Sequence, residues 1–341
     1  MQTFQPKRLF TFRLFAIICI SGAFVVFSAC GSSGDSGGAA SGGKKFLSVG
    51  TAPPGGAFFV VGGAIAQAVS ENLGTSQNWE ISAEATKGTQ ENIRRLVNGE
   101  LDFALANAAI SYFALRGEGA WGKPHDVRAI MTLAPNIALF ITPKSSGIET
   151  LSDLAGKRVV VGPAGAGFNY FLEPILKAHG VTYDDFTPLN NTQAGAVDML
   201  ADGSAAAAFL GGAVPTASIT QASASQDINF IPFDDSAKES LFSEYPFFNG
   251  AKIPAGTYRG QDADFNGMNV GSMHLITGAN VDEETVYQFT KILYEHRADV
   301  VKKHPAGKAI NPKNIIRDTG IPFHPGAIRY YKEINIWPAS E

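Results

Sequence analysis

Three glycine-containing loops in this chain stand where an apolar, strand-like run gives way to a helix-like one. The first contains Gly55 and Gly56, the second contains Gly88, and the third spans residues 162–167. The first turn of a helix carries backbone N–H groups that have no partner inside the helix, and glycine lets a ligand approach them closely. The chemistry that this pattern predicts is the binding of a small anion.

Side chains beside the first two loops extend this prediction, and an asparagine follows the next apolar run. Each has a plainer alternative: the glycines can form a tight turn, the phenylalanines can belong to the core, and the threonine can be a helix cap. The ligand contacts predicted from this part of the chain are Gly55, Gly56, Phe58, Phe59, Thr89, Asn92 and Asn107.

The third loop has the spacing Gly-x-x-Gly-x-Gly, whereas a dinucleotide-binding loop has Gly-x-Gly-x-x-Gly. An anion pocket therefore fits better than a nucleotide. A second cleft-wall segment is expected at 211–215, for which a plain turn is the alternative, and an exposed helix start is the alternative for the asparagine after the third loop. The contacts predicted here are Gly165, Ala166, Gly167, Asn169, Tyr170, Gly211 and Pro215.

Alternating strand and helix patterns position these loops. Strand-like runs occupy 46–51, 79–85 and 101–106, and helical spacing follows at 58–73 and 89–98. Such alternation predicts an open, largely parallel sheet covered by helices. In that architecture ligands bind beyond the carboxyl ends of the strands.

The pattern restarts in the second half of the chain, which predicts a second α/β lobe. A strand at 158–161 leads into the third loop and a helix at 168–179 that glycine ends. Near the carboxyl terminus, apolar spacing with acids first and lysines last predicts one long amphipathic helix over 282–303.

Two further strand-like runs, 136–143 and 270–277, leave the first half and return to it. We therefore expect lobe 1 to comprise residues 44–136 plus 272–341, and lobe 2 to comprise residues 137–271. Two crossings allow hinge closure with little repacking of either core.

The amino terminus has the features of an export signal. Basic residues precede an uncharged apolar run, Leu14–Ala29, which is short for a membrane-spanning helix and ends in small residues followed by Cys30. The Phe-Ser-Ala-Cys segment resembles a bacterial lipobox. We expect residues 1–29 to be a lipoprotein signal peptide, Cys30 to be lipidated, and residues 30–43, rich in Gly and Ser, to be a flexible tether.

Composition excludes several other classes of function. The signal would remove three of 27 basic residues and none of 31 acidic ones, so the mature chain is acidic and nucleic acid is not an expected partner. Only Cys30 would remain of the two cysteines, which leaves no disulfide or cysteine-based metal site. The six histidines show no metal-binding spacing and no Gly-x-Ser-x-Gly elbow occurs, so no cofactor, metal or enzymatic activity is expected.

An ordered series of short segments, covering about residues 46–333, resembles the TAXI group of TRAP transporter solute-binding receptors. The segments are Gly55-Gly56-Ala57-Phe58-Phe59, Gly88-Thr89-Gln90-Glu91-Asn92, Asp153-Leu154-Ala155-Gly156-Lys157, Ile253-Pro254-Ala255-Gly256-Thr257-Tyr258 and His324-Pro325-Gly326-Ala327. The resemblance implies an α/β fold of the type II periplasmic-binding-protein kind, with two lobes joined by two hinge strands. It further implies capture of a C5 amino or oxo acid, such as glutamate or 2-oxoglutarate, and its delivery to TRAP permease subunits.

This chain departs from the family at the third loop, where Ala166-Gly167-Phe168 replaces the common Ser-Gly-Thr. The loss of two hydroxyl donors shifts the expected preference toward a less polar or a differently shaped solute. We expect a monomeric receptor outside the cytoplasmic membrane, anchored there by its lipid. The alternatives are a binding module that feeds a signalling receptor with the same fold and, as a weaker alternative, a secreted enzyme.

Overall fold

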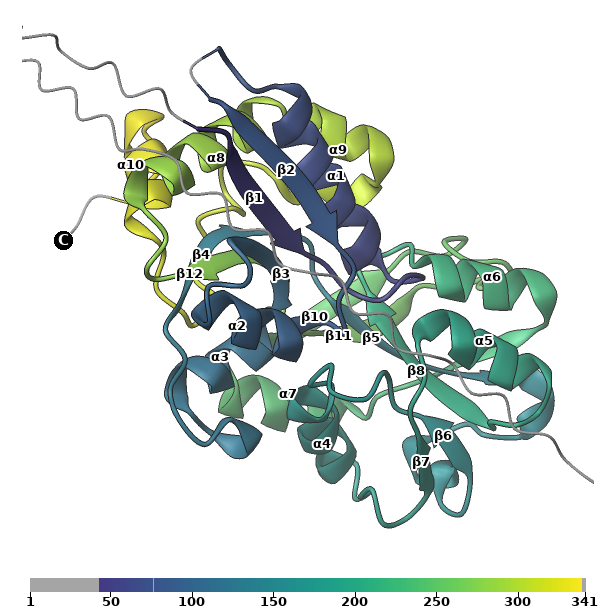
Figure 1. Cartoon of the computed structure of the whole chain (residues 1–341). Helices are drawn as coiled ribbons and strands as arrows, with labels where there is room; N and C mark the ends of the chain where they lie inside the picture. Colours follow the sequence, from purple (N-terminus) through teal and green to yellow (C-terminus); the bar gives the residue numbers. More distant parts are fainter. Residues whose placement is uncertain (1–42, 76, 339–341) are drawn as a thin grey trace, which may run out of the picture. The chain divides into compact units, whose positions relative to one another are not determined.

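The protein is described by a computed structural model that places residues 43–75 and 77–338. The predicted signal peptide, the lipidation site Cys30 and the tether up to residue 42 lie outside these residues. Figure 1 shows two β-sheets with helices packed around them. Within the described ranges, no helix is both long enough and apolar enough to cross a bilayer.

The first sheet, sheet A, has the strand order β2-β1-β3-β12-β4. β1 pairs in parallel with β2 and β3, but β12 runs antiparallel to both β3 and β4. The expectation of a largely parallel sheet is wrong for this half, because β12 begins at the edge of the sheet where β3 ends, with Met273 opposite Asn107. The strands are β1 (Lys45–Gly50), β2 (Trp79–Glu84), β3 (Phe103–Asn107), β4 (Val127–Thr132) and β12 (Met273–Gly278).

The second sheet, sheet B, has the order β10-β11-β5-β8-β6-β7, and β9 pairs with β5. Its parallel pairs are β6 with β7 and β6 with β8, and the other pairs are antiparallel. The strands are β5 (Ile137–Pro143), β6 (Arg158–Val160), β7 (Thr187–Leu189), β8 (Ala207–Gly212), β9 (Ile228–Ile231), β10 (Phe248–Ile253) and β11 (Phe265–Val270).

Helices cover both faces of each sheet. The α-helices are α1 (Ala57–Glu71), α2 (Thr89–Val97), α3 (Ala108–Arg116), α4 (Asn169–Ala178), α5 (Gln193–Ala201), α6 (Ala217–Ser225), α7 (Asp235–Glu244), α8 (Glu283–Glu295), α9 (Arg297–Lys303) and α10 (Pro325–Glu333). Short 3-10 helices are η1 (Gly119–Trp121), η2 (Lys144–Ser146), η3 (Leu151–Leu154) and η4 (Pro305–Ala309).

The alternation of side chains along β3 explains how sheet A holds two layers of helices. Phe103 and Leu105 pack on the face covered by α1, α8 and α10, whereas Ala104 and Ala106 face α2 and α3. Successive residues of a strand point to opposite faces, so small residues on the α2 and α3 side let those helices pack closely against the sheet. All four residues are fully buried.

Sheet B is built in the same way. Leu139 and Ile141 of β5 pack against α5 and α6, whereas Phe140 faces α4 and α7 on the opposite side of the sheet. We call sheet A with its helices lobe 1 and sheet B with its helices lobe 2. The expected class, two α/β lobes joined by two chain crossings, is confirmed by this arrangement.

The two crossings are short and are tied to each other. The first runs from β4 to β5, and the second is the two-residue step from β11 to β12. At the first crossing, the Asn136 N–H donates to Asn269 Oδ1 and the Asn136 carbonyl accepts from the Val270 N–H. Asn107 also donates from its side-chain amide to the carbonyls of Val270 and Gly271.

Two predicted elements are divided in the structure. The expected strand over 270–277 is two strands, because β11 pairs within sheet B and β12 within sheet A. The expected helix over 282–303 is broken at His296, where α8 ends and α9 begins. Asp282 caps α8 as its sequence position suggests, accepting from the Thr285 N–H at 2.8 Å.

Candidate binding site

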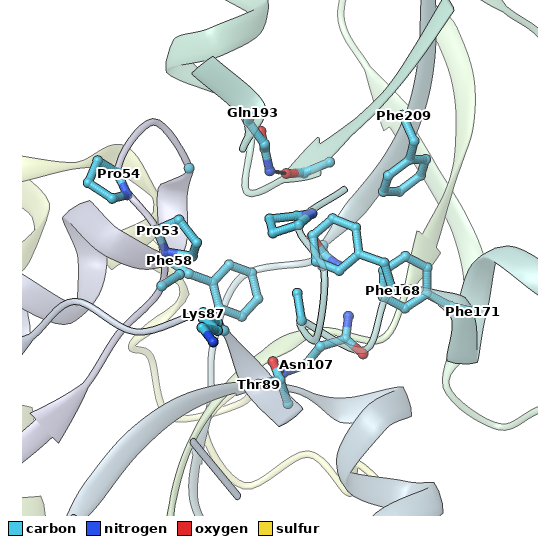
Figure 2. A pocket seen from close by; sticks show the side chains of 17 residues that line it. Pro53, Pro54, Phe58, Lys87, Thr89, Asn107, Phe168, Phe171, Gln193 and Phe209 are labelled. Carbon is cyan, nitrogen blue, oxygen red and sulfur yellow. Dashed lines mark hydrogen bonds between the residues drawn. The ribbon is translucent and has the colours of Figure 1, made fainter. Parts of the chain in front are cut away.

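A small cavity lies between lobe 1 and lobe 2, beyond the carboxyl ends of β1, β2, β3, β6 and β8 (Figure 2). About 50 Å³ of it is open to the centres of water molecules. Its walls are Ala52, Pro53, Pro54, Gly56, Phe58, Lys87, Gly88, Thr89, Asn107, Asn136, Pro163, Ala166, Phe168, Phe171, Gln193, Phe209 and Gly211.

Two helices of lobe 1 begin at this cavity without a side-chain cap. Gly56 is the N-cap of α1 and Gly88 is the N-cap of α2, and neither can offer a side-chain oxygen to the first turn. Within the described residues, no acceptor meets the N–H groups of Phe58 or Thr89. Helix dipoles and free N–H groups together make each of these helix starts attractive to an anion.

Asn107 and Gln193 line the cavity, but their side chains already form hydrogen bonds with other parts of the protein. Asn107 caps α3 through its side-chain oxygen and bonds the β11 to β12 crossing through its amide. Gln193 donates to the Gly211 carbonyl at 2.7 Å and accepts from the Ser218 hydroxyl at 2.9 Å. These two side chains therefore shape the cavity more than they offer free bonding groups.

Asn136 and Thr89 do have free bonding capacity toward the cavity. Asn136 is only 6% exposed, yet its side-chain amide meets no partner in the described part of the chain. The Thr89 hydroxyl accepts from the Asn107 N–H at 3.0 Å and keeps its own proton available. A side-chain amide that lines a cavity and has no protein partner is available to a ligand or a water molecule.

Lys87 is the one charged residue among the described residues that line the cavity, and no Asp, Glu, His, Cys, Ser or Tyr lines it. Its ammonium has no ion-pair partner in the described ranges. The wall thus has no general acid–base pair and no negative charge. No group of three or more potential metal ligands occurs in the described residues.

Aromatic rings form much of the remaining wall. Figure 2 shows Phe58 from lobe 1 across the cavity from Phe168 of lobe 2, with Phe171 and Phe209 behind the latter. Phe168 and Phe209 meet edge to face with ring centroids 5.8 Å apart. The cavity therefore has a cationic, N–H-rich side in lobe 1 and an apolar side dominated by lobe 2.

The structure brings six of the predicted contact residues to the cavity wall. They are Gly56, Phe58, Thr89, Asn107, Ala166 and Gly211. The other eight, which lie elsewhere, are Gly55, Phe59, Asn92, Gly165, Gly167, Asn169, Tyr170 and Pro215.

Asn92 and Phe59 lie away from the cavity for different reasons. Asn92 is fully buried, and its amide donates to the carbonyls of Thr51 and Leu105, which ties α2 to β1 and β3. Phe59 is 36% exposed on α1 and borders a separate surface depression. Asn169 and Pro215 are exposed as well.

Gly55 and Gly167 lie where the two lobes touch. A Cβ on Gly55 would be 3.2 Å from the Ala194 Cβ, and a Cβ on Gly167 would be 3.2 Å from the Ile110 Cδ1. Both glycines also have positive φ. They allow close contact between lobes, whereas Gly165 has open space around it.

Tyr170 of α4 inserts between aromatic residues of lobe 1. It stacks on Phe113 and Trp121 with centroids 5.5 and 6.0 Å apart. Its hydroxyl lies near Gln90 and the Ala120 backbone but meets neither in hydrogen-bond geometry, and burial raises its pKa. This contact joins the lobes beside the cavity.

The residues that the sequence did not single out are mainly Lys87, Asn136, Gln193 and three phenylalanines of lobe 2. Lys87 directly precedes Gly88, the predicted loop glycine. A cation next to a helix start without a side-chain cap could have indicated an anion-binding residue from the sequence. Asn136 carried a weaker sequence signal, because it is a polar residue at the expected crossing between the lobes. Nothing local in the sequence marks Phe171 or Phe209 as wall residues.

A family model for the NMT1-like family matches residues 49–334, and the chain belongs to this family. The strand orders and the two crossings described above are those of the expected type II periplasmic-binding-protein fold, which is thereby confirmed.

Solved structures share this fold at low sequence identity. A protein from Bordetella bronchiseptica RB50 is 14% identical with a TM-score of 0.51, over 84% of this chain and 82% of that one. A binding-protein component of a phosphonate ABC transporter from Pseudomonas aeruginosa is 13% identical (TM-score 0.49; 77% and 78% covered). The alkanesulfonate-binding protein from Xanthomonas axonopodis pv. citri, bound to MOPS, is 16% identical (TM-score 0.48; 85% and 83% covered).

Proposed function

We propose that the protein is an extracytoplasmic solute-binding receptor that captures a small organic anion between its two lobes without altering it. The observation that carries this proposal is the cavity itself. It is enclosed by both lobes, it receives two uncapped helix starts and Lys87, and its described wall has no acid–base pair. A site of this composition is suited to holding an anion and offers little for turning it over.

The proposed movement is closure of residues 44–136 plus 272–341 onto residues 137–271. Both crossings are short, and the contacts made by Gly55, Gly167 and Tyr170 join the lobes beside the cavity. These contacts would form on closure, so ligand binding and lobe contact would reinforce each other.

The resemblance to TAXI receptors supports delivery of the solute to a TRAP-type permease, with the receptor held at the membrane by lipid on Cys30. It also offers the C5 acids glutamate and 2-oxoglutarate as first candidates for the solute. Six residues that were predicted from the sequence and that line the cavity are proposed as ligand contacts. They are Gly56, Phe58, Thr89, Asn107, Ala166 and Gly211.

A melting screen over small carboxylic acids tests the proposal. A ligand at 100 times its dissociation constant stabilises the folded state by about 2.7 kcal/mol, which raises the melting midpoint by several degrees. Recovery of the added acid unchanged after incubation would separate binding from catalysis. Chemical conversion of the acid would contradict a receptor function, and the absence of any shift across the screen would remove small carboxylic acids as ligands.

A further inference from the structure

The charges at the cavity favour one carboxylate and leave no place for an ammonium group. Lys87 supplies the one formal charge on the described wall, and the starts of α1 and α2 add partial positive charge. A ligand ammonium would face these positive groups without an Asp or Glu to pair with. Amino acids such as glutamate are therefore poorly matched to this wall.

Asn136 provides an independent indication of a ligand on the same wall. The residue is only 6% exposed and lines the cavity, and its side-chain amide has no partner in the described residues, while its backbone is fixed to the second crossing. Together with the free proton of Thr89, it presents donors beside the two helix starts. These donors and Lys87 can surround one carboxylate.

The opposite wall carries no charged side chain that could pair with a second carboxylate. Phe168, Phe171 and Phe209 line it with Pro163 and Ala166, and none of them offers a side-chain donor. A second carboxylate there would meet no cationic side chain, only the backbone N–H groups at the start of α4, which has no side-chain cap. Only about 50 Å³ of the cavity is open to the centres of water molecules, which also restricts the tail to a short one.

We propose that the ligand is a short-chain monocarboxylate with an apolar tail. Its carboxylate is held by Lys87, Asn136, Thr89 and the starts of α1 and α2, and its tail lies among the phenylalanines of lobe 2. This inference rests on the proposed receptor function and narrows it, since it disfavours glutamate and 2-oxoglutarate.

Titration calorimetry with three acids of four carbons each tests whether the protein prefers a monocarboxylate to a dicarboxylate or an amino acid of the same chain length. Butanoate carries one carboxylate, succinate adds a second, and 2-aminobutanoate adds an ammonium group. We expect butanoate to bind at least about tenfold more tightly than either, a difference of about 1.4 kcal/mol. Tighter binding of succinate, 2-oxoglutarate or glutamate would overturn the inference and leave the receptor function standing, whereas no binding by any of the acids would count against both.

Two variants locate the carboxylate. Asn136→Asp adds a negative charge with almost no change in shape, and we expect it to weaken butanoate binding at least about 100-fold. The control is Asn266→Asp at an exposed position on β11, which we expect to have no effect.

Lys87→Gln should weaken butanoate binding about tenfold. Its control is Lys177→Gln at an exposed position on α4, which should not weaken binding. Lys87 is itself exposed, so this variant is expected to fold even if Asn136→Asp does not. Wild-type affinity in Lys87→Gln, or in a folded Asn136→Asp, would overturn the proposal.

Discussion

His274 is a titratable side chain that is fully removed from water, and it makes the protein sensitive to acid. Its ring nitrogens lie 2.8 Å from the Ser111 hydroxyl and 3.2 Å from the Thr319 hydroxyl, and burial lowers its pKa to about 3. The unfolded chain binds a proton near pH 6.5, whereas the folded protein resists protonation until about pH 3. Stability is therefore full above pH 6.5 and is lost as the pH falls toward 3.

We predict that wild type loses about 1.6 kcal/mol more unfolding free energy between pH 6.5 and 5 than His274→Gln does, since the cost per pH unit rises toward about 1.4 kcal/mol as the unfolded histidine becomes fully protonated. Denaturant unfolding at both pH values measures this difference. Burial also lowers the pKa of His125, His304 and His324. These histidines occur in both proteins, so their contributions to the pH dependence cancel in the comparison. Equal pH dependence in the two proteins would show that His274 is not protected in this way.

Residue type alone did not separate the free polar groups from the engaged ones. Asn92, Asn107 and Asn136 all stand near strand ends or helix starts in the sequence. The side-chain amides of Asn92 and Asn107 donate to backbone carbonyls of other elements. Of the three, only Asn136 lines the cavity with a side chain that has no partner in the described residues. Which asparagine is free depends on carbonyls far away in the sequence, so it is visible only when the backbone hydrogen bonds are accounted for in three dimensions.

At the scale of elements, the helix starts were the most predictable part of the site. The glycines before α1 and α2 and the apolar spacing after them define these starts locally, and the structure places both at the cavity. The break at His296 and the division between β11 and β12 were not predictable in the same way. Apolar runs continue across both points, and the division of the strand follows from pairing with two different sheets.

The contact between η1 and α4 gives a prediction with a closely matched control. Gly119 and Gly122 both have positive φ, 61° and 67°, but only a Cβ on Gly119 would meet Tyr170, at 2.9 Å from Cε1. Gly119→Ala should push the lobes apart beside the cavity and weaken acid binding about tenfold. Gly122→Ala carries the same backbone strain without the clash.

Calorimetry on the two alanine variants, using the acid that binds wild type most tightly, measures the difference between them. Equal affinities would mean that the Tyr170 contact does not contribute to the bound state. A loss of affinity in both variants by the same factor would point to backbone strain in η1 instead.

At the scale of the whole molecule, the two sheets have separate helix layers, yet one apolar cluster runs from Ile110 in lobe 1 through Tyr170 to Phe209 in lobe 2. The alternation of patterns predicted two lobes, because each lobe is built largely from local strand and helix units. The walls that the lobes present to each other could not be predicted, because they join residues that are far apart in the sequence. The apolar character of the lobe 2 wall is the main example.

Amide hydrogen exchange, with and without the acid that binds most tightly, tests the central claim most directly. We predict that saturating acid slows exchange in peptides covering 52–60 and 86–92, where the N–H groups of Phe58 and Thr89 have no partner in the described residues, and in 163–171 across the cavity. The capped start of α5, where Thr192 already accepts from the Gly195 N–H, should change less. Protection confined to other surfaces, or unchanged exchange at both helix starts under saturation, would contradict capture of the anion between the lobes.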